Sequence, residues 1–332
     1  MWPAVQPISR VALVLSPAIG DSLLMMTIAR NLRHNGVEVT VFGAHIHSLR
    51  NWFPGVDTQE YLGAGHPGAG LPGAGHPGAG LPLLDPRAPG IPVPRDLAPR
   101  LSGFDCVLQM HRNRPFIGLE RSHPRVIFLD HLCRVRSPQS MADRLSRFCL
   151  DELGLASAHK SNGMTAPAGL LYRKHPLRVA IHPTASTADK CWLASRFIRL
   201  ALQLRKLGFS PEFVVAPQER ADWLHIERLG LALPDLGSLD NVAAWIYESG
   251  WFIGNDSGIG HLASSLHIPT LSLFMRSGIA RTWRPGWGAG QVLIGSTYLP
   301  TGFLKERYWK YMLSVRQVSR AFEQLRTSFR FA

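Results

Sequence analysis

Apolar runs of strand length recur along the chain, and each of the first ones is followed by a stretch with helical spacing. Arg10–Ser16 is nearly continuously apolar, Ser22–Arg33 carries apolar residues every three or four positions, and Val37–Phe42 alternates. Near-continuous apolar strands are typical of a parallel sheet that is covered on both faces. The strand–helix–strand order is typical of crossover connections between parallel strands. The pattern therefore predicts a doubly wound α/β domain whose ligands bind beyond the strand ends.

The same alternation continues after a polar break. Lys160–Lys174 has little periodicity and predicts an interdomain linker. On either side of it we predict strands at Phe104–Met110, Arg125–Leu129, Leu177–Ile181, Glu212–Ala216, Trp251–Ile253 and Thr270–Phe274, and helices at Ser140–Leu153, Ala194–Leu207 and Ile259–Leu266. With 332 residues the chain is long enough for two domains. We expect an N-terminal domain over 1–165 and a C-terminal domain over 175–304.

Two segments depart from this alternation. Residues 63–82 repeat G-A-G-H-P-G-A-G-L-P twice, and proline-rich spacing runs on to Pro99. Glycine and proline at this density bury little apolar surface, so 63–99 is predicted to be a surface insertion in the first domain. The tail, 305–332, carries apolar residues at three- and four-residue spacing and seven basic residues. It predicts a basic amphipathic helix whose apolar face packs on the protein and whose basic face contacts anionic lipid.

The net charge of the chain is +13 and its basic residues are 30 Arg and 6 Lys. This balance favours polyanionic partners such as phosphorylated sugars or anionic lipid. Nucleic acid is not expected, because the basic residues are scattered and no nucleic-acid-binding signature is present. No apolar run reaches the ~18 residues of a membrane span, and the first ten residues lack a signal-peptide pattern, so we expect a cytoplasmic protein. The four cysteines fit no metal or redox spacing.

The strongest candidate for chemistry is the turn after the Trp251–Ile253 strand. The backbone N–H groups of Ser257, Gly258 and Ile259 are expected at a helix start, which attracts anions. Asp256 adds a carboxylate, and His261 lies about one turn into the helix. The alternative is an ordinary helix capped by Asp256 or Ser257, with His261 in a structural role.

The stretch from Gly254 to Phe274, G-N-D-S-G-I-G-H-L-A-S-S-L-H-I-P-T-L-S-L-F, resembles the signature of glycosyltransferase family 9, the ADP-heptose:lipopolysaccharide heptosyltransferases. The chain matches that pattern at eight positions: Gly254, Asp256, Ser257, Gly258, His261, Leu262, Ala263 and Pro269. It departs at Ser264 and Ser265, where alanine is usual, but both residues are small enough for tight helix packing.

Two further segments resemble the same family, in the same order along the chain. L-S-P-A-I-G-D-S-L resembles its N-terminal motif through Gly20 and Asp21, with Thr27 at a position where proline is frequent. H-P-T-A-S-T-A-D-K-C-W resembles its phosphate-binding segment through a shared set of residues: His182, Pro183, Lys190 and Trp192, with Thr184 in place of glycine.

The resemblance implies a GT-B fold, in which two Rossmann-like domains face each other across a cleft, with the acceptor on the first domain and the nucleotide-sugar donor on the second. It also implies inverting transfer without a metal or other cofactor. Asp21 would be the general base, although the residues alone favour a cap for the helix that starts at Ser22.

The donor contacts follow from the same resemblance. Lys190 and the helix start would hold the diphosphate, with hydrogen bonds from Ser186 and Thr187, while Asp256 would contact the sugar. The resemblance places the strand end near Glu219 beside the nucleoside. The complete set of nucleotide and phosphate contacts is Lys190, Ser186, Thr187, Glu219, Ser257, Gly258 and His261.

The acceptor side rests on fewer signals. Arg112 and Arg114 directly follow the Phe104–Met110 strand, where two guanidinium groups suit a phosphorylated or carboxylated acceptor, or are simply surface charges. The implied partners are ADP-heptose and an anionic glycolipid such as a lipopolysaccharide core, with peripheral contact at the inner membrane.

Two other functional classes remain open. One is a nucleotide-sugar epimerase or a nicotinamide-dependent oxidoreductase of similar fold, although no G-x-G-x-x-G follows the first strand. The other is a nucleotide-sugar-binding protein without activity. The chain has no D-x-D pair of the kind that metal-dependent glycosyltransferases use, which favours metal-independent transfer.

Overall fold

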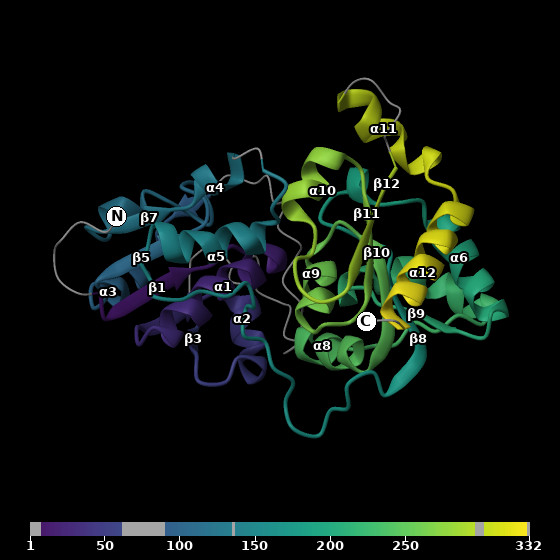
Figure 1. The fold of residues 1–332 in the computed structure, drawn as a ribbon, viewed down its shortest axis with the longest axis horizontal. Helices are drawn as coiled ribbons and strands as arrows, with labels where there is room; N and C mark the ends of the chain where they lie inside the picture. The colour runs from purple at the N-terminus through teal and green to yellow at the C-terminus, as the bar shows by residue number, and fades with distance from the viewer. Residues whose placement is uncertain (1–7, 62–89, 135–136, 296–301, 331–332) are drawn as a thin grey trace, which may run out of the picture. The chain divides into compact units, whose positions relative to one another are not determined.

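The computed structural model describes residues 8–61, 90–134, 137–295 and 302–330 (Figure 1). Their backbone contacts divide them into two compact units, the first ending at Thr165 and the second beginning at Ala166. Each unit is built on a five-stranded parallel sheet. The repeat predicted at 63–82 lies outside the described residues.

The first unit has the strand order β3-β2-β1-β5-β7. The strands of this sheet are β1 (Arg10–Val14), β2 (Glu38–Phe42), β3 (Asp57–Gln59), β5 (Cys106–Gln109) and β7 (Val126–Phe128). Its helices are α1 (Ile19–His34), α2 (Ala44–Ser48), α3 (Leu97–Leu101), α4 (Asp130–Arg134) and α5 (Met141–Asp151), and its short 3₁₀ turns are η1 (Arg50–Trp52) and η2 (Leu119–Arg121). Because strand order reverses between β1 and β5, the loops after these two strands diverge and leave room for a ligand.

Helix α1 begins earlier than its sequence pattern predicts. It starts at Ile19 rather than Ser22, and its N-cap residue is Ala18, which provides no side-chain cap. Asp21 therefore lies within the first turn, where the helix dipole favours a carboxylate. The prediction that Asp21 caps a helix at Ser22 is wrong, because the chain already turns helical at Ile19.

The end of the predicted insertion over 63–99 is folded. Strand β4 (Ile91–Pro92) pairs with β6 (Phe116–Ile117), and both leucines that bound α3 are fully buried. A Cβ at Gly90 would lie 2.1 Å from the carbonyl oxygen of Asn113, so only glycine allows this close approach of two backbones. The proline content misled the prediction here, because burial of leucine outweighs it.

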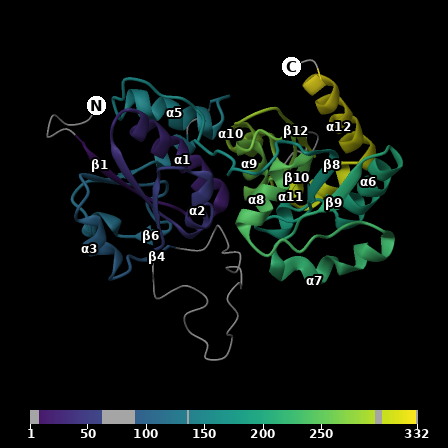
Figure 2. The same cartoon turned by 90° about the horizontal axis from the view of Figure 1, so that it is seen from below.

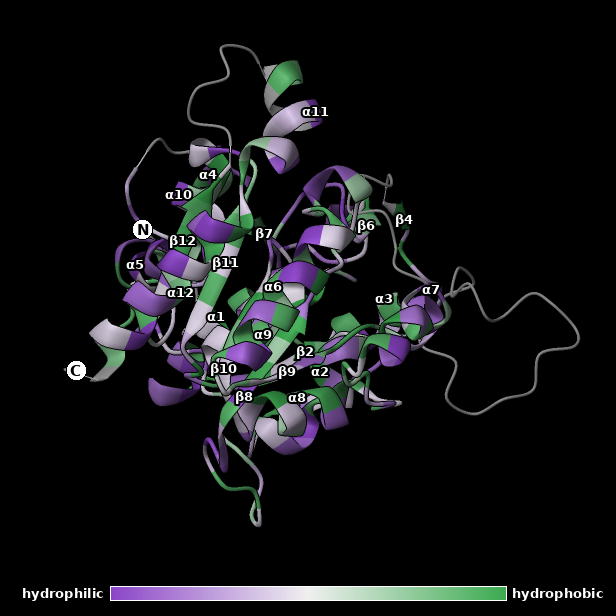
Figure 3. Cartoon of the chain, turned by 90° about the vertical axis from the view of Figure 1, so that its right-hand side faces the viewer, coloured by the Kyte–Doolittle hydropathy of each residue, from purple (hydrophilic) through white to green (hydrophobic). Residues whose placement is uncertain are grey.

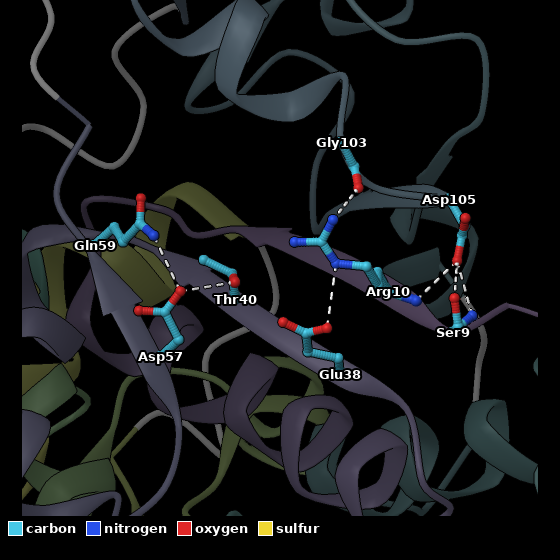
Figure 4. A network of polar contacts seen from close by, with 8 residues as sticks. All are labelled: Ser9, Arg10, Glu38, Thr40, Asp57, Gln59, Gly103 and Asp105. Atoms are coloured by element: carbon cyan, nitrogen blue, oxygen red, sulfur yellow. Dashed lines mark hydrogen bonds and ion pairs between the residues drawn. The ribbon is translucent and has the colours of Figure 1, made fainter.

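Polar contacts connect the amino ends of β1, β2 and β5 in the first sheet (Figure 4). Asp105 Oδ2 accepts hydrogen bonds from the backbone N–H groups of Ser9 and Arg10, both at 2.8 Å, and from the Ser9 hydroxyl at 2.9 Å. The Arg10 guanidinium donates to Glu38 at 3.2 Å and to the Gly103 carbonyl at 2.9 Å. This network fixes β1 against β2 and β5 at the end of the sheet opposite to Asp21.

The second unit has the strand order β12-β11-β10-β8-β9. Its strands are β8 (His175–His182), β9 (Ser210–Phe213), β10 (Ser249–Asn255), β11 (Thr270–Phe274) and β12 (Gly290–Ile294). Its helices are α6 (Ala194–Lys206), α7 (Arg220–Trp223), α8 (Leu239–Tyr247), α9 (Gly258–Ser265), α10 (Ser277–Trp283), α11 (Gly302–Met312) and α12 (Val315–Arg330), and its 3₁₀ turns are η3 (Ala188–Lys190), η4 (Pro217–Glu219) and η5 (Leu224–Leu229). Helices α6 and α12 cover one face of the sheet, and α8 and α9 cover the other (Figure 2).

Strand β10 is longer than predicted. It includes Gly254 and Asn255, which the sequence pattern assigned to the turn, so only Asp256 and Ser257 connect it to α9. A Cβ at Gly254 would lie 2.9 Å from the Phe252 ring and 3.1 Å from the His182 carbonyl oxygen. This glycine is therefore explained by packing inside the sheet rather than by turn geometry.

The C-terminal segment is two helices rather than the single one predicted over 305–332. The break is at Ser314, whose hydroxyl accepts from Gln317 N–H at 3.2 Å while Gln317 Oε1 accepts from Ser314 N–H at 2.8 Å. This capping box starts α12. Val318 and Phe322 of α12 are buried against the sheet, as predicted for the apolar face. Most residues of α12 are hydrophilic (Figure 3).

No helix within the described ranges is both long and apolar enough to span a lipid bilayer.

Candidate active site

In the second unit, the candidate site lies where β8 and β10 end side by side. The order of the strands reverses between these neighbours, so their loops diverge, as at the ligand-binding crevices of doubly wound sheets. Lys190 follows β8 and Asp256 follows β10, and Lys190 Nζ lies 3.0 Å from Asp256 Oδ2. The two side chains are 28% and 12% exposed, which leaves the lysine open to a ligand while the carboxylate is largely covered.

The loop that carries Lys190 is braced by the C-terminal segment. Trp309 on α11 is fully buried, and its Nε1 donates to the Asp189 carbonyl oxygen at 2.7 Å. Trp192, just beyond Lys190, donates through Nε1 to the Leu313 carbonyl oxygen at 2.9 Å. Two buried indoles therefore fix the middle of the 3₁₀ turn η3 and the chain just after it.

Asn255 is a structural residue of this site that the sequence reasoning missed. It is fully buried at the end of β10, and its Oδ1 accepts from Trp192 N–H at 2.9 Å. Its Nδ2 donates to the Pro183 carbonyl oxygen at 2.7 Å. One amide therefore joins the β8 loop to the β10 loop. The available signal was its place in the signature segment, directly before Asp256.

Helix α9 begins at Gly258, and Ser257 is its N-cap, with Oγ accepting from Gly260 N–H at 3.4 Å. The first N–H groups of a helix have no intrahelical acceptor, and the dipole makes this end attractive to an anion. Lys190 supplies a full positive charge beside it. The start of α9 and Lys190 together suit a phosphate or diphosphate group.

Glu219 and His182 form a second polar group at the same edge of the sheet. Glu219 Oε2 accepts from the Thr184 hydroxyl at 3.0 Å, and His182 Nδ1 lies 2.8 Å from the Val214 carbonyl oxygen. Burial lowers the pKa of His182, against the opposing effects of the Val214 carbonyl and the Glu219 carboxylate. His182 therefore acts as a neutral part of the framework. Thr184, which replaces a glycine of the family pattern, orients Glu219.

The remaining predicted donor residues differ in their surroundings. Ser186 and Thr187 lie in the loop between β8 and η3, and the Thr187 hydroxyl is buried with no hydrogen-bond partner among the described residues. This orphaned hydroxyl is available to a ligand oxygen. His261 is only 5% exposed and packs edge to face against Trp287, with ring centroids 6.2 Å apart. The His261 ring is therefore part of the packing under α9.

In the first unit, the first turn of α1 presents Asp21, directly after the loop that follows β1. The Ser22 hydroxyl donates to the Ser16 carbonyl oxygen at 2.7 Å, and the Tyr61 hydroxyl donates to the Leu15 carbonyl oxygen at 3.2 Å. His45 Nε2 lies 2.7 Å from the Pro17 carbonyl oxygen. These contacts fix the loop backbone, while the Asp21 side chain stays 23% exposed.

Asp21 has a neighbour that the sequence reasoning did not select. His111 follows β5, and its Nε2 lies 3.8 Å from Asp21 Oδ2, while its Nδ1 lies 3.8 Å from Asp130 Oδ1. Burial disfavours the charged imidazole, but hydrogen bonding to Asp21 and Cys133 and the attraction of the Asp21 carboxylate outweigh it and raise the pKa of His111 to about 10. The signal was present, since His111 is the first residue after a strand at the switch point.

Of the two arginines predicted to bind an acceptor, Arg112 has a guanidinium with protein partners in this structure, and Arg114 is held through its backbone. The Arg112 guanidinium pairs with Glu120 at 3.3 Å and lies over the Phe128 ring, 4.5 Å from its centroid. The backbone N–H of Arg114 donates to the His111 carbonyl oxygen at 3.1 Å. Arg112 is exposed and Arg114 half-buried. Both lie in the loop that carries His111.

The two sites suit different chemistry. The second unit offers a lysine, a helix start and the unpartnered Thr187 hydroxyl, which together suit a negatively charged group. The first unit offers a carboxylate that can accept a proton. Across 8–61, 90–134, 137–295 and 302–330, no group of three or more His, Cys, Asp and Glu side chains is arranged to hold a metal ion.

Comparison with known proteins extends these observations. The model of glycosyltransferase family 9 (heptosyltransferase) matches residues 109–306, which is more than half of the chain. No curated protein sequence matches.

Solved structures match over nearly the whole chain. A family 9 glycosyltransferase from Veillonella parvula is 18% identical with a TM-score of 0.69, and the match covers 97% of this chain and 99% of that one. The ADP-heptose lipopolysaccharide heptosyltransferase II of E. coli is 16% identical, with a TM-score of 0.66 and coverage of 95% and 98%. E. coli heptosyltransferase WaaC with ADP is 15% identical, with a TM-score of 0.63 and coverage of 95% and 99%. The α/β fold of the GT-B class that was predicted from the sequence is confirmed.

Proposed function

The chain belongs to glycosyltransferase family 9, and from this premise we propose that it transfers a heptose from ADP-heptose to a lipopolysaccharide core or a similar acceptor. The observation that carries the donor assignment is the Lys190–Asp256 pair, 3.0 Å apart at the switch point of the second unit and beside the start of α9. Solved structures of similar fold include E. coli WaaC with ADP and with ADP-2-deoxy-2-fluoro heptose, which supports this choice of donor.

The donor diphosphate binds between Lys190 and the first turn of α9. Lys190 and the N–H groups at Ser257 and Gly258 stabilise the negative charge that grows on the leaving ADP. The buried Thr187 hydroxyl gains a phosphate oxygen as its partner, and Ser186 adds a second hydroxyl. In this arrangement His261 supports the helix by packing.

Sugar and nucleoside contacts complete the donor site. Asp256, held by Lys190, accepts hydrogen bonds from sugar hydroxyls on its free oxygen. Glu219, at the end of the β9 segment, accepts from a ribose hydroxyl and is held for this role by Thr184.

Transfer proceeds with inversion and without a metal. The acceptor hydroxyl gives its proton to the Asp21 carboxylate as its oxygen bonds to the anomeric carbon. The bond from that carbon to the diphosphate oxygen breaks, and the electron pair leaves with ADP. A positioned base of this kind contributes ~10²–10⁴-fold to the rate.

Arg112 and Arg114 bind anionic groups of the acceptor. Arg112 already pairs with Glu120 at 3.3 Å, so an acceptor phosphate or carboxylate would exchange with that carboxylate. A glycolipid acceptor also requires the enzyme to reach a membrane surface. Helix α11 is suited to this, because Phe303 and Tyr311 are 66% and 57% exposed on a helix that also carries Lys310.

The test compares the lipopolysaccharide of cells with and without this protein by mass spectrometry. We expect the core to lose one heptose when the protein is absent, and purified protein with ADP-heptose to restore that mass to core glycolipid extracted from the deletion strain. An unchanged core and no transfer in vitro would contradict the proposal. Conversion of the donor to its epimer, or ADP binding without turnover, would instead identify one of the other two functional classes.

A further inference from the structure

His111 lies between two carboxylates that come from different helices. Its Nε2 faces Asp21 on α1 and its Nδ1 faces Asp130 at the start of α4, each at 3.8 Å. The His111 side chain is 17% exposed, which is less than either carboxylate at 23% and 35%. The imidazole is therefore the covered centre of a row of three ionisable groups, of which Asp21 is one end.

This geometry selects the charged form of the imidazole. A neutral imidazole carries one N–H and would turn a lone pair toward one of the two carboxylates, whereas an imidazolium directs an N–H at both. An imidazolium also offsets one of the two negative charges that meet here. Despite burial, Asp21 and Cys133 raise the pKa of His111, which agrees with a charged imidazole beside Asp21.

The far end of the row is anchored. Asp130 Oδ2 accepts a hydrogen bond from the Arg112 backbone N–H at 2.8 Å, so its other oxygen is directed at His111. The backbone of His111 is fixed too, because its carbonyl oxygen accepts from Gln109 Nε2 at 2.7 Å. Hydrogen bonds therefore fix both the Asp130 carboxylate beside the imidazole and the backbone that carries the imidazole.

We propose that His111 is a positioning residue for the transfer reaction: as an imidazolium anchored by Asp130, it orients the Asp21 carboxylate toward the acceptor hydroxyl. This inference rests on the proposed function of Asp21 as the general base. His111 keeps its own protons throughout the step. The acceptor proton moves to the Asp21 carboxylate, and the imidazolium sets which oxygen is left free to receive it.

Other charged and titratable groups near His111 enter the pH dependence. Asp21 approaches from α1, and Asp130 and Cys133 approach from α4. Arg112 and Arg114 follow on the same loop, where the Arg112 guanidinium is directed to Glu120. Of these groups, only the two carboxylates lie within ion-pair distance of the ring.

The first experiment measures the charge of His111 without any activity assay. Histidine side chains of the full chain are labelled with ¹⁵N, and the His111 resonance is assigned by its loss in His111→Gln. We expect this imidazole to remain protonated through neutral pH in the wild type and to titrate at lower pH in Asp21→Asn and in Asp130→Asn. Titration near the ordinary value of about 6.5 in the wild type would overturn the inference.

The second experiment measures kcat against pH for His111→Gln, with ADP-heptose and core glycolipid from the deletion strain. The attraction between the His111 cation and the Asp21 carboxylate is lost in this variant, so the acid limb of the kcat profile, where kcat falls toward low pH, should move up by about 1 pH unit. We expect kcat at neutral pH to fall about 10-fold, while ADP affinity stays unchanged. A purely structural role would lower the melting temperature without moving the acid limb.

The matched control is His131→Gln, on the same short helix α4 as Asp130. His131 Nε2 pairs with Glu152 at 2.9 Å, and its side chain is 47% exposed, so an imidazole–carboxylate pair is removed outside the row. The control should keep the wild-type pH profile. If the wild type transfers heptose and His111→Gln has the acid limb of the wild type, the inference about His111 is wrong but the proposed function stands. If the wild type transfers no heptose, the proposed function is wrong.

Discussion

The candidate sites of the two units occupy equivalent places in their sheets but carry opposite chemistry. In the first unit the loops after β1 and β5 diverge, and in the second the loops after β8 and β10 diverge. In the first unit, His111 after β5 meets Asp21 in the first turn of α1, and Asp130 at the start of α4 approaches the same imidazole. The second brings one lysine to one carboxylate beside the start of a helix.

The difference shows that the fold alone does not determine the chemistry of a site. Both sheets are parallel, five-stranded and reversed in order at one point, so the scaffold supplies the same opening twice. The residues that fill the opening decide whether it attracts a proton or an anion. A surplus of carboxylate suits proton removal in the first unit, and a lysine with free N–H groups suits a diphosphate in the second.

Asp21→Asn is the most direct test of the contrast between the two sites. The amide keeps the shape of the carboxylate but accepts no proton, so kcat for transfer should fall by the ~10²–10⁴ credited to a general base. ADP affinity, measured by isothermal titration, should stay at the wild-type value because the donor contacts lie in the second unit. Asp21 provides no helix cap, but its charge in the first turn of α1 interacts favourably with the helix dipole, so the melting temperature should fall only slightly.

Normal turnover in that variant would remove Asp21 from the mechanism. Weakened ADP binding in Asp21→Asn would contradict the division of labour itself, because it would give a residue of the first unit a part in holding the donor.

Lys190→Ala tests the candidate donor site in the second unit. A hydrogen bond to a charged group contributes about 1.5–3 kcal/mol, so ADP affinity should fall about 10- to 100-fold. The variant also leaves Asp256 facing the diphosphate without its partner at 3.0 Å, which adds repulsion. Isothermal titration with ADP measures the loss.

The control for this charge change is Lys174→Ala, in the same unit. Lys174 Nζ lies 3.9 Å from Glu248, and its side chain is 49% exposed. Removing it takes away one positive charge without touching the loops after β8 and β10. Equal losses of ADP affinity in the two variants would mean that net charge, rather than the Lys190 position, binds the nucleotide.

Sequence reasoning found the residues of the second site but not their pairing. Lys190 and Asp256 each stood in a short motif, and the parallel strands that precede them could be predicted from apolar runs. That their side chains meet depends on β8 and β10 being neighbours, which is a property of the whole sheet. Asn255 can join the two loops only because β8 and β10 are neighbouring strands.

The first site was predicted less completely for the same reason. Asp21 was selected through its motif, whereas His111 and Asp130 became significant only because β5 and β7 bring their loops toward α1. Local signals also failed where tertiary burial opposed them. Prolines suggested an insertion up to residue 99, but the buried leucines of α3 fold that end of it. The capping box at Ser314 was a readable signal for the break between α11 and α12.

A smaller effect is expected from Ser257→Ala, which separates capping from ligand binding. Loss of an N-cap hydroxyl costs about 1 kcal/mol of stability. Ser238→Ala is the matched variant, because Ser238 caps α8 in the same unit by accepting from Asn241 N–H at 3.1 Å. Both should lower the melting temperature similarly, and only Ser257→Ala should weaken ADP binding, by a few-fold. Equal ADP affinity in the two variants would limit Ser257 to its cap.

The smallest effect is expected from Asp105→Asn, at the end of the first sheet opposite to Asp21. Asp105 Oδ2 accepts from the backbone N–H groups of Arg10 and Ser9, and these hydrogen bonds lower the pKa of the carboxyl. A carboxyl whose pKa is lower in the folded than in the unfolded chain stabilises the fold at pH values above its unfolded pKa of about 3.9. That stabilisation is lost as the pH falls through the folded pKa. The carboxylate is exposed, so solvent screening should keep the contribution below about 1 kcal/mol.

Denaturant unfolding of wild type and Asp105→Asn from pH 7 down to pH 2 therefore measures a small difference that closes on the acid side. A difference that persists at pH 2 would assign the effect to the shape of the side chain rather than to its charge. Asp105 directly precedes β5, whereas Asp21 and His111 follow the carboxyl ends of β1 and β5, and these two strands are parallel. Turnover and its acid limb should be those of the wild type. A change in either would mean that the contacts at the amino ends of β1 and β5 reach the site at their carboxyl ends, and that the site is less independent of its scaffold than the contrast between the two units implies.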